Sequence, residues 1–353
     1  MGRHEKALEI LHAGTVIPAI PLVLDKQRKF DEAGQRTLIR YYLAAGVGGI
    51  ATAVHTTQFE IRKPEYGLFE PVLRITAEEI ERFERDTGKT IVRIAGVCGP
   101  SEQAVKEARL AASLGYDAAL LSPGGLESLT EREMIARTAD VAAIIPVIGF
   151  YLQMACGGRR LSFDYWKAVA DTPNVVALKC APFNRYQSID LVRGCVFSKR
   201  RDKVALYTGN DDNIVADLLT TFSFPVDGHE VKVRFSGGLL GHWSLWVHSV
   251  VPLYEKIKAC REKEEIPADL LTTAAQITDC NGAFFDAAHQ FAGCIPGVHE
   301  VLRRQGLMKG DWCLDPSIVL SPGQKEEIDR VYRMYPNLND DAFVHENLEK
   351  WKK

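Results

Sequence analysis

The stretch Asn174-Val-Val-Ala-Leu-Lys-Cys180 places a lysine, Lys179, directly after a continuous apolar run. A run without alternation of polar and apolar residues is typical of a parallel strand that is covered on both faces. The sequence therefore predicts eight strands, of which Val175–Leu178 is the sixth. The other seven runs are Thr15–Ile20, Gly49–Val54, Ile91–Val97, Ala118–Leu121, Val147–Phe150, Val204–Tyr207 and Val233–Phe235.

Amphipathic segments of helical length separate these runs. They are Asp31–Ala44, Ala77–Asp86, Ser101–Ser113, Thr130–Ala143, Phe163–Ala170, Tyr186–Val192 and Asn213–Thr221. Eight strand–helix units in about 250 residues predict an α/β fold, a (β/α)8 TIM barrel. A doubly wound open sheet has the same alternation and is the competing fold. We expect Ser223–Val231 to be a loop-like insertion before the eighth strand.

The C-terminal part of the chain shows helical patterns and no strand pattern. The expected helices are Asp269–Phe291, Val298–Gly306, Pro322–Met334 and Asp340–Trp351. Glycines and prolines separate these segments, as is usual between helices. We therefore expect a barrel over residues 1–258 and a C-terminal helical region over residues 259–353.

The composition favours a globular cytoplasmic protein. The 353 residues carry a formal net charge of −3, so no basic excess points to nucleic acid or an anionic membrane. The eight cysteines form no CxxC pair, which indicates reduced thiols rather than a zinc or disulfide framework. The N-terminus lacks the apolar core of a secretory signal. Three long uncharged stretches contain Gly, Pro or His, and we interpret them as buried strands with adjoining segments rather than membrane spans.

Lys179 is the first candidate for chemistry, because reacting groups of a barrel lie at the carboxyl ends of its strands. A buried amine whose pKa fell from about 10.4 to about 7.5, at a cost of roughly 4 kcal/mol, could attack a carbonyl. The alternative is a structural lysine that reaches solvent or pairs with a carboxylate such as Asp211. The lysine segment by itself leaves both interpretations open.

Other polar groups follow other strands. His55-Thr56-Thr57-Gln58 could hold a small carboxylate or merely form a turn. Asp211 and Asp212 could bind a divalent metal, although a helix cap is the simpler interpretation and no metal is expected. Nucleotide-phosphate motifs are absent, so no cofactor is expected.

Taken together, the segments resemble the dihydrodipicolinate synthase / N-acetylneuraminate lyase family over roughly residues 12 to 308. The carrying segments are Gly14–Pro21, Gly46–Ile50 with Thr56-Thr57, Gly115–Pro123, Val175–Lys179 and Thr208–Asp212. The resemblance implies class I aldolase chemistry, in which Lys179 forms a Schiff base with pyruvate or another 2-oxo acid. It implies that Thr57 holds the carboxylate and that Thr56 belongs to a hydroxyl relay. It also implies that Gly209 and Phe235 lie close to the imine.

The sequence departs from the family pattern at several of these positions. His55 stands where the family usually has glycine, and we expect it to contact the substrate. The loop tyrosine that a neighbouring subunit supplies is missing, because Ser122-Pro-Gly-Gly125 occupies that place. The fifth-strand tyrosine fits only with a shift of one residue, since the family spacing from Pro146 ends at Phe150. We predict Tyr151 as the proton shuttle and Arg160, or its neighbour Arg159, as an anion contact.

These observations predict a Schiff-base-forming lyase, aldolase or hydro-lyase that acts on a small 2-oxo acid. Family members are commonly tetramers, so a homo-oligomer, dimer or tetramer, is expected. Two alternatives remain open: a metal-assisted hydro-lyase that uses Asp211 and Asp212, and a non-catalytic relative that binds a keto acid.

Overall fold

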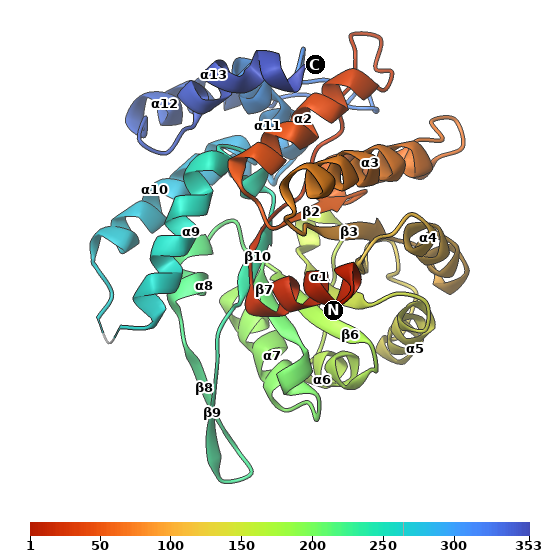
Figure 1. Cartoon of the computed structure of the whole chain (residues 1–353). Helices are drawn as coiled ribbons and strands as arrows, with labels where there is room; N and C mark the ends of the chain where they lie inside the picture. Colours follow the sequence, from red (N-terminus) through yellow and green to blue (C-terminus); the bar gives the residue numbers. More distant parts are fainter. Residues whose placement is uncertain (264) are drawn as a thin grey trace.

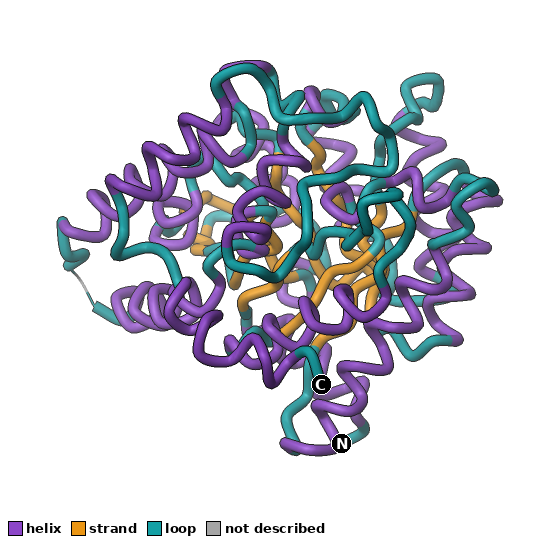
Figure 2. Tube along the Cα trace, turned by 90° about the horizontal axis from the view of Figure 1, so that it is seen from above, coloured by secondary structure: helices purple, strands orange, loops and turns teal. Residues whose placement is uncertain are grey.

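The computed structural model describes residues 1–263 and 265–353 and shows a barrel of eight parallel strands. The strands are β1 (Val16–Pro18), β2 (Gly49–Thr52), β3 (Val92–Val97), β4 (Ala118–Leu121), β5 (Val147–Leu152), β6 (Val175–Ala181), β7 (Ala205–Thr208) and β10 (Gly237–Leu240). Neighbouring strands pair in this order, with β10 between β7 and β1. A parallel bridge between Ala19 and Ala51 joins β1 to β2 and closes the ring. The predicted TIM barrel is confirmed, and Figure 2 shows the strands at its centre.

Helices surround the strands (Figure 1). They are α2 (Glu32–Ala45), α3 (Phe69–Thr87), α4 (Ser101–Ser113), α5 (Glu131–Ala142), α6 (Phe163–Asp171), α7 (Arg185–Val196), α8 (Ile214–Leu219) and α9 (Val247–Arg261). Side-chain caps start several of them, as the sequence predicts; the Thr130 hydroxyl, for example, accepts from the Glu133 N–H in a capping box. Helix α3 begins well before the expected Ala77. Pro71 lies in its first turn, where a missing N–H costs nothing.

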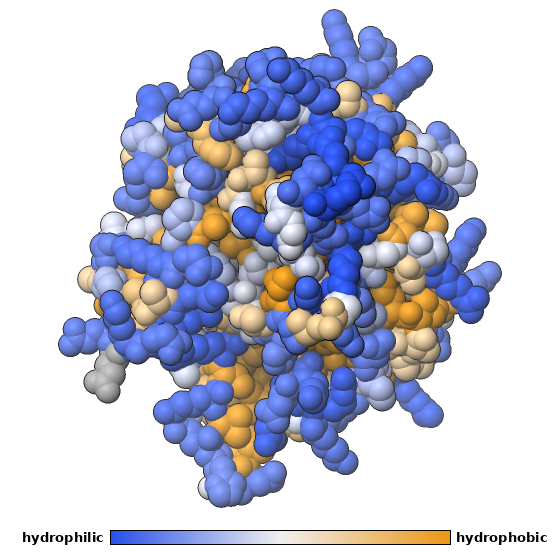
Figure 3. Space-filling model, in the orientation of Figure 1, coloured by the Kyte–Doolittle hydropathy of each residue, from blue (hydrophilic) through white to orange (hydrophobic). Residues whose placement is uncertain are grey.

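The eighth barrel strand is not the predicted Val233–Phe235. That segment ends a hairpin of β8 (Phe222–Val226) and β9 (His229–Val233), which projects from the barrel in Figure 1 and presents apolar residues in Figure 3. The expected loop-like insertion is therefore wrong. The eighth strand of the barrel is β10. It contains two glycines, whose lack of a side chain lets it pack closely against its neighbours. A Cβ on Gly237 would lie 2.4 Å from the Thr15 carbonyl oxygen, and one on Gly238 would lie 2.5 Å from the Trp243 ring.

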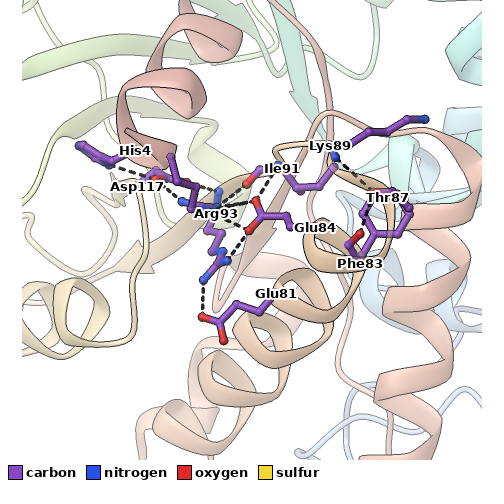
Figure 4. A network of polar contacts seen from close by, with 10 residues as sticks. His4, Glu81, Phe83, Glu84, Thr87, Lys89, Ile91, Arg93 and Asp117 are labelled. Carbon is purple, nitrogen blue, oxygen red and sulfur yellow. Dashed lines mark hydrogen bonds and ion pairs between the residues drawn. The ribbon is translucent and has the colours of Figure 1, made fainter. Parts of the chain in front are cut away.

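Helix α1 (Arg3–Ala13) closes the amino-terminal end of the barrel. Ala7 and Leu11 are buried against the residues that fill the barrel interior. A polar network anchors this helix: Arg3 donates to Asp117 at 2.7 Å, and Asp117 also accepts from the Arg93 N–H at 2.9 Å (Figure 4). Because α1 covers this end, the opening toward the interior lies at the carboxyl ends of the strands.

The C-terminal helices cover one side of the barrel. They are α10 (Asp269–Phe284), α11 (Cys294–Arg304), α12 (Gln324–Met334) and α13 (Asp341–Trp351). The Tyr41 hydroxyl of α2 donates to Asp340 at 2.7 Å, which ties the barrel to the start of α13. The expected boundary after residue 258 lies inside the continuous helix α9. No helix in residues 1–263 and 265–353 has the length and apolar character needed to cross a bilayer.

Candidate functional site

A small cavity of about 60 Å³ lies at the carboxyl ends of the barrel strands. The barrel contributes most of its wall, and the C-terminal helical region contributes the remainder. The lining residues are Ala19, Val54, His55, Thr56, Phe150, Leu152, Gln153, Cys156, Lys179, Ala181, Phe183, Gly209, Asp211, Gly241, Phe285, Phe291 and Cys294.

Lys179 lies inside this cavity. Alternation along β6 turns Ala177, Lys179 and Ala181 toward the barrel interior. Only 7% of Lys179 is exposed, and its Nζ lies 4.3 Å from the centroid of the Phe150 ring. Burial lowers the pKa of the amine to about 8, although the negative charge of Asp211 acts in the opposite direction. A fraction of the amine is therefore neutral, and hence nucleophilic, near physiological pH.

Asp211 is the carboxylate that faces the lysine in the cavity. Burial raises the pKa of its carboxyl to about 7, while the His242 and Gly241 N–H groups and the charge of Lys179 act to lower it. The His242 N–H donates to its Oδ1 at 2.8 Å. Asn281, from α10, donates to the Asp211 carbonyl at 2.7 Å and thereby fixes this loop. A carboxyl held in this way can exchange a proton at neutral pH.

Gly209 leaves space for the lysine side chain. A Cβ at this position would lie 2.5 Å from Lys179 Cε and 2.8 Å from Ala181 Cβ. The Gly209 N–H donates to the Cys180 carbonyl at 2.7 Å, so the β7 loop is held against β6. The structure thus places Gly209 beside Lys179, where the resemblance implies it.

The predicted threonine pair forms a short 3-10 helix, His55–Thr57, directly after β2. His55 and Thr56 line the cavity, whereas Thr57 is fully buried and does not. The Thr56 hydroxyl donates to the Ala19 carbonyl at 2.6 Å, and the Thr57 hydroxyl donates to the Ile20 carbonyl at 2.7 Å. Since each hydroxyl has one proton, both are engaged in holding this loop against the segment that follows β1. Burial and the nearby Lys179 charge lower the pKa of His55 to about 4, so its ring is neutral.

Tyr151 does not reach the cavity, contrary to the prediction. Its ring packs on Trp166 outside the strand layer, with centroids 5.0 Å apart, and its hydroxyl accepts from the Leu161 N–H at 3.1 Å. Phe150 faces the cavity instead, and it pairs with Lys179 in the β5–β6 register. The reason is the two-residue period of a strand, in which a shift of one position turns a side chain to the other face. The Phe150 ring has no dissociable proton, so it cannot act as a proton shuttle.

Phe235 and Arg160 also lie away from Lys179. Because the eighth strand starts at Gly237, Phe235 lines a larger open depression of about 760 Å³ near the end of α9, and Gly241 occupies the wall of the cavity. Arg160 is exposed and does not line the cavity. Its neighbour Arg159 donates to the carbonyls of Leu129 and Leu126 and so fastens the loop after β4. The structure therefore contradicts the predicted positions of Phe235 and Arg160.

Several cavity residues were missed in the sequence. Phe183 follows β6, and Phe285, Phe291 and Cys294 come from the C-terminal region. No local pattern marks the C-terminal three, because they meet the barrel only through tertiary packing. For metal binding, the described part of the chain contains no cluster of three or more His, Cys, Asp or Glu side chains, and Asp212 is exposed. The pairing of Asp211 with Asp212 as metal ligands therefore has no geometric support.

Comparison with known proteins assigns the chain to a family. The model of the dihydrodipicolinate synthetase family matches residues 12–221, more than half of the sequence. The chain belongs to this family. The match covers β1 to β7 and includes Lys179, Gly209 and Asp211.

Two relatives in sequence and one solved structure illustrate the similarity. The 4-hydroxy-tetrahydrodipicolinate synthase of Clostridium novyi is 30% identical over 142 residues, 39% of this chain and 46% of that protein. The N-acetylneuraminate lyase of Citrobacter koseri is 26% identical over 208 residues, 58% of this chain and 65% of that protein. The matches thus span about half to two-thirds of these relatives. YagE of E. coli K12, solved with pyruvate, shares the fold with a TM-score of 0.71 and 16% identity over 91% of this chain and 97% of YagE.

Proposed function

We propose that the protein is a Schiff-base-forming lyase or aldolase that acts on pyruvate or a related 2-oxo acid. The observation that carries this proposal is the buried amine of Lys179 in a small cavity, with the pKa lowered by burial to about 8. The amine attacks the C2 carbonyl of the oxo acid, and loss of water gives a protonated imine. This imine withdraws electrons from the adjacent bonds, so that C3 loses a proton and becomes a carbon nucleophile as the enamine.

Backbone groups of the loop after β2 are the proposed contacts of the oxo acid carboxylate. The hydroxyl protons of Thr56 and Thr57 are already donated to the Ala19 and Ile20 carbonyls, just after β1. The N–H groups of His55 and Thr56 lie in the first turn of the 3-10 helix, whose leading N–H groups have no acceptor within the helix. We assign the threonine hydroxyls to bracing this turn, and the N–H groups to the carboxylate.

Asp211 is the proposed acid–base group, because no tyrosine is among the described residues that line the cavity. Its carboxyl faces Lys179, and its pKa of about 7 lets it accept the C3 proton and return a proton to the product oxygen. The thiols of Cys156 and Cys294 also line the cavity, but burial raises the pKa of both, to about 11 for Cys156. The neutral His55, with its pKa lowered to about 4, is a weaker base than the Asp211 carboxylate.

Borohydride reduction in the presence of pyruvate tests the proposal. We expect irreversible modification, located at Lys179 by peptide mass spectrometry, and no modification of the Lys179→Met variant. Lys106, an exposed lysine of α4, supplies the matched control, because Lys106→Met should leave the labelling unchanged. Labelling that survives Lys179→Met would reject the assignment of the imine to Lys179. Pyruvate that binds without any reduction product would reject the imine itself and favour a relative that only binds keto acids.

A further inference from the structure

Three phenylalanines form an apolar wall of the cavity next to Lys179. Phe183 follows β6, while Phe285 and Phe291 lie between α10 and α11. The rings of Phe183 and Phe291 meet edge to face, with centroids 5.7 Å apart and an interplanar angle of 77°. The Phe285 ring packs against Gly241 at the end of β10, where an added Cβ would lie 3.2 Å from its Cζ. The barrel and the C-terminal region therefore build this wall together.

The backbone holds two of these rings in an unusual conformation. Phe183 has a φ of +53° and Phe291 a φ of +67°, in the left-handed region that bulky residues rarely adopt. The Phe183 N–H donates to the Asn210 side chain at 3.0 Å, and the Phe291 N–H donates to the Asp286 carbonyl at 3.0 Å. Such strain persists only where the surroundings fix it, and it concentrates at functional sites.

The Phe291 loop is fastened by buried polar groups from the C-terminal helices. The Asp286 carboxylate, only 3% exposed, accepts from the Gly293 N–H at 2.9 Å and from the Ser321 hydroxyl. The Gln324 amide of α12 donates to the Gly293 carbonyl at 2.9 Å. The C-terminal region thus holds an aromatic side chain in position against the barrel cavity.

Among the residues that the structure describes, the cavity lining offers no second cation to another anionic group. Lys179 is the one lysine or arginine in that lining, and its nitrogen carries no positive charge in the enamine that attacks the aldehyde. Arg160 is exposed outside the cavity, and Arg159 is bound to carbonyls of the loop after β4. Asp211 adds a carboxyl that would repel an anion whenever it is ionised. A carboxylate placed among the three phenylalanines would therefore be buried without a partner.

We propose that Phe183, Phe285 and Phe291 form the subsite for the second substrate, and that this substrate is an aldehyde with an uncharged, apolar side chain. The inference rests on the proposed imine at Lys179. In the condensation direction, the enamine carbon forms a bond to the aldehyde carbon and the aldehyde oxygen takes up a proton. Hydrolysis of the imine then releases a 4-hydroxy-2-oxo acid. The apolar chain of the aldehyde packs against the aromatic rings, and this contact removes the chain from water.

Butyraldehyde and succinic semialdehyde test this subsite, because they share a four-carbon chain and differ in a terminal methyl group or carboxylate. The enzyme is incubated with pyruvate and either aldehyde, and the hydroxy-oxo acid formed is quantified by mass spectrometry. We expect kcat/KM to be higher for butyraldehyde by about tenfold or more, as the cost of an unpaired buried carboxylate predicts.

Variants of Phe291 test whether this side chain causes the preference for butyraldehyde over succinic semialdehyde. Phe291→Arg should lower the butyraldehyde to succinic semialdehyde ratio at least tenfold, whereas Phe291→Leu, which keeps an apolar side chain, should retain most of it. Phe83→Leu, a half-buried phenylalanine of α3 far from the cavity lining, is the matched control and should leave the ratio unchanged.

The outcomes separate the two proposals. Absence of a borohydride-trapped imine with pyruvate rejects the proposed function itself. A trapped imine together with equal or better use of succinic semialdehyde overturns the apolar subsite, and so does a trapped imine without any consumption of butyraldehyde. A ratio that is unaltered by Phe291→Arg in folded protein also overturns it.

Discussion

Replacement of Lys179 by methionine should abolish imine formation and at the same time stabilise the protein. The lysine amine is buried, and its pKa is lowered from an ordinary value of 10.5 to about 8 in the folded state. Methionine has a similar length, so its side chain can keep the contact with Phe150 and fill the same volume without carrying a charge. The variant removes the free energy that the folded protein spends on a buried ammonium.

The magnitude follows from the two pKa values. One pKa unit corresponds to about 1.4 kcal/mol, so the shift from 10.5 to about 8 represents a penalty of about 3 kcal/mol at neutral pH. The pKa of about 8 already includes the attraction between the ammonium and Asp211, so the expected gain for Lys179→Met is about 3 kcal/mol. With an unfolding entropy of about 2.1 cal/mol/K per residue, this gain raises Tm by about 4 °C.

The pH dependence of the stability gain distinguishes removal of the buried charge from improved packing. Below about pH 8 the amine is protonated in both folded and unfolded states, so the full penalty applies. Between about 8 and 10.5 the folded state loses the proton first, and the penalty shrinks; above 10.5 both states are neutral. The stability advantage of Lys179→Met should therefore be complete at pH 7 and absent by pH 10.5.

Differential scanning calorimetry at pH 7 and at pH 10.5 measures the effect, with Lys106→Met as the control on an exposed helical surface, where changes stay within about 0.5 kcal/mol. An unchanged or lowered Tm for Lys179→Met at pH 7 would refute the reasoning, because burial of the ammonium would then carry no free-energy cost. A gain that persisted at pH 10.5 would attribute the effect to packing instead.

Four further predictions follow from the same geometry. Borohydride trapping of the wild type with pyruvate should rise with pH through about 8, because only the neutral Lys179 amine attacks the carbonyl. Asp211→Asn should still form the imine but slow hydrogen–deuterium exchange at C3 of pyruvate, followed by NMR, by about 10²-fold; unchanged exchange would exclude Asp211 as the base. Gly209→Ala should reduce trapping about tenfold or more in folded protein, since the new Cβ would lie 2.5 Å from Lys179 Cε. Asp117→Ala, far from the cavity, should lose about 3 kcal/mol of unfolding free energy in urea because it leaves the buried Arg93 N–H without an acceptor and removes the ion pair with the half-buried Arg3; full stability of this variant would contradict the role given to the network.

Local patterns in the sequence mark the β8–β9 hairpin and the inward-facing position of Phe150. Asp227-Gly228 stands between alternating apolar residues, and both residues adopt positive φ, as a two-residue hairpin turn requires. This pattern marks the β8–β9 hairpin that was expected to be a loop. Likewise, Lys179 and Phe150 both face inward in paired strands. The family spacing from Pro146 had already indicated Phe150 rather than Tyr151.

Other features could not be predicted in this way. The eighth strand begins with two glycines, whose lack of a side chain lets β10 pass close to Thr15 and Trp243, and no apolar run announces it. The position of Phe291 depends on a loop that is held by the Ser321 hydroxyl, which donates to Asp286, and by the Gln324 amide, which donates to the Gly293 carbonyl. These contacts join residues that are distant along the chain, so local patterns carry no record of them.

The sequence by itself determined the eight-stranded barrel and the place of Lys179 near the end of a buried strand, because strand periodicity and the order of strands and helices are local properties of the chain. The family resemblance, rather than a local pattern, implied the place of Gly209 beside it. The tertiary structure alone decided which side chains surround the amine. It turned Tyr151 outward, left Arg160 in solvent and brought Phe291 from the C-terminal helices to the cavity. The surroundings of a buried amine set its pKa and its substrate, and they are assembled by packing between segments that no local pattern connects.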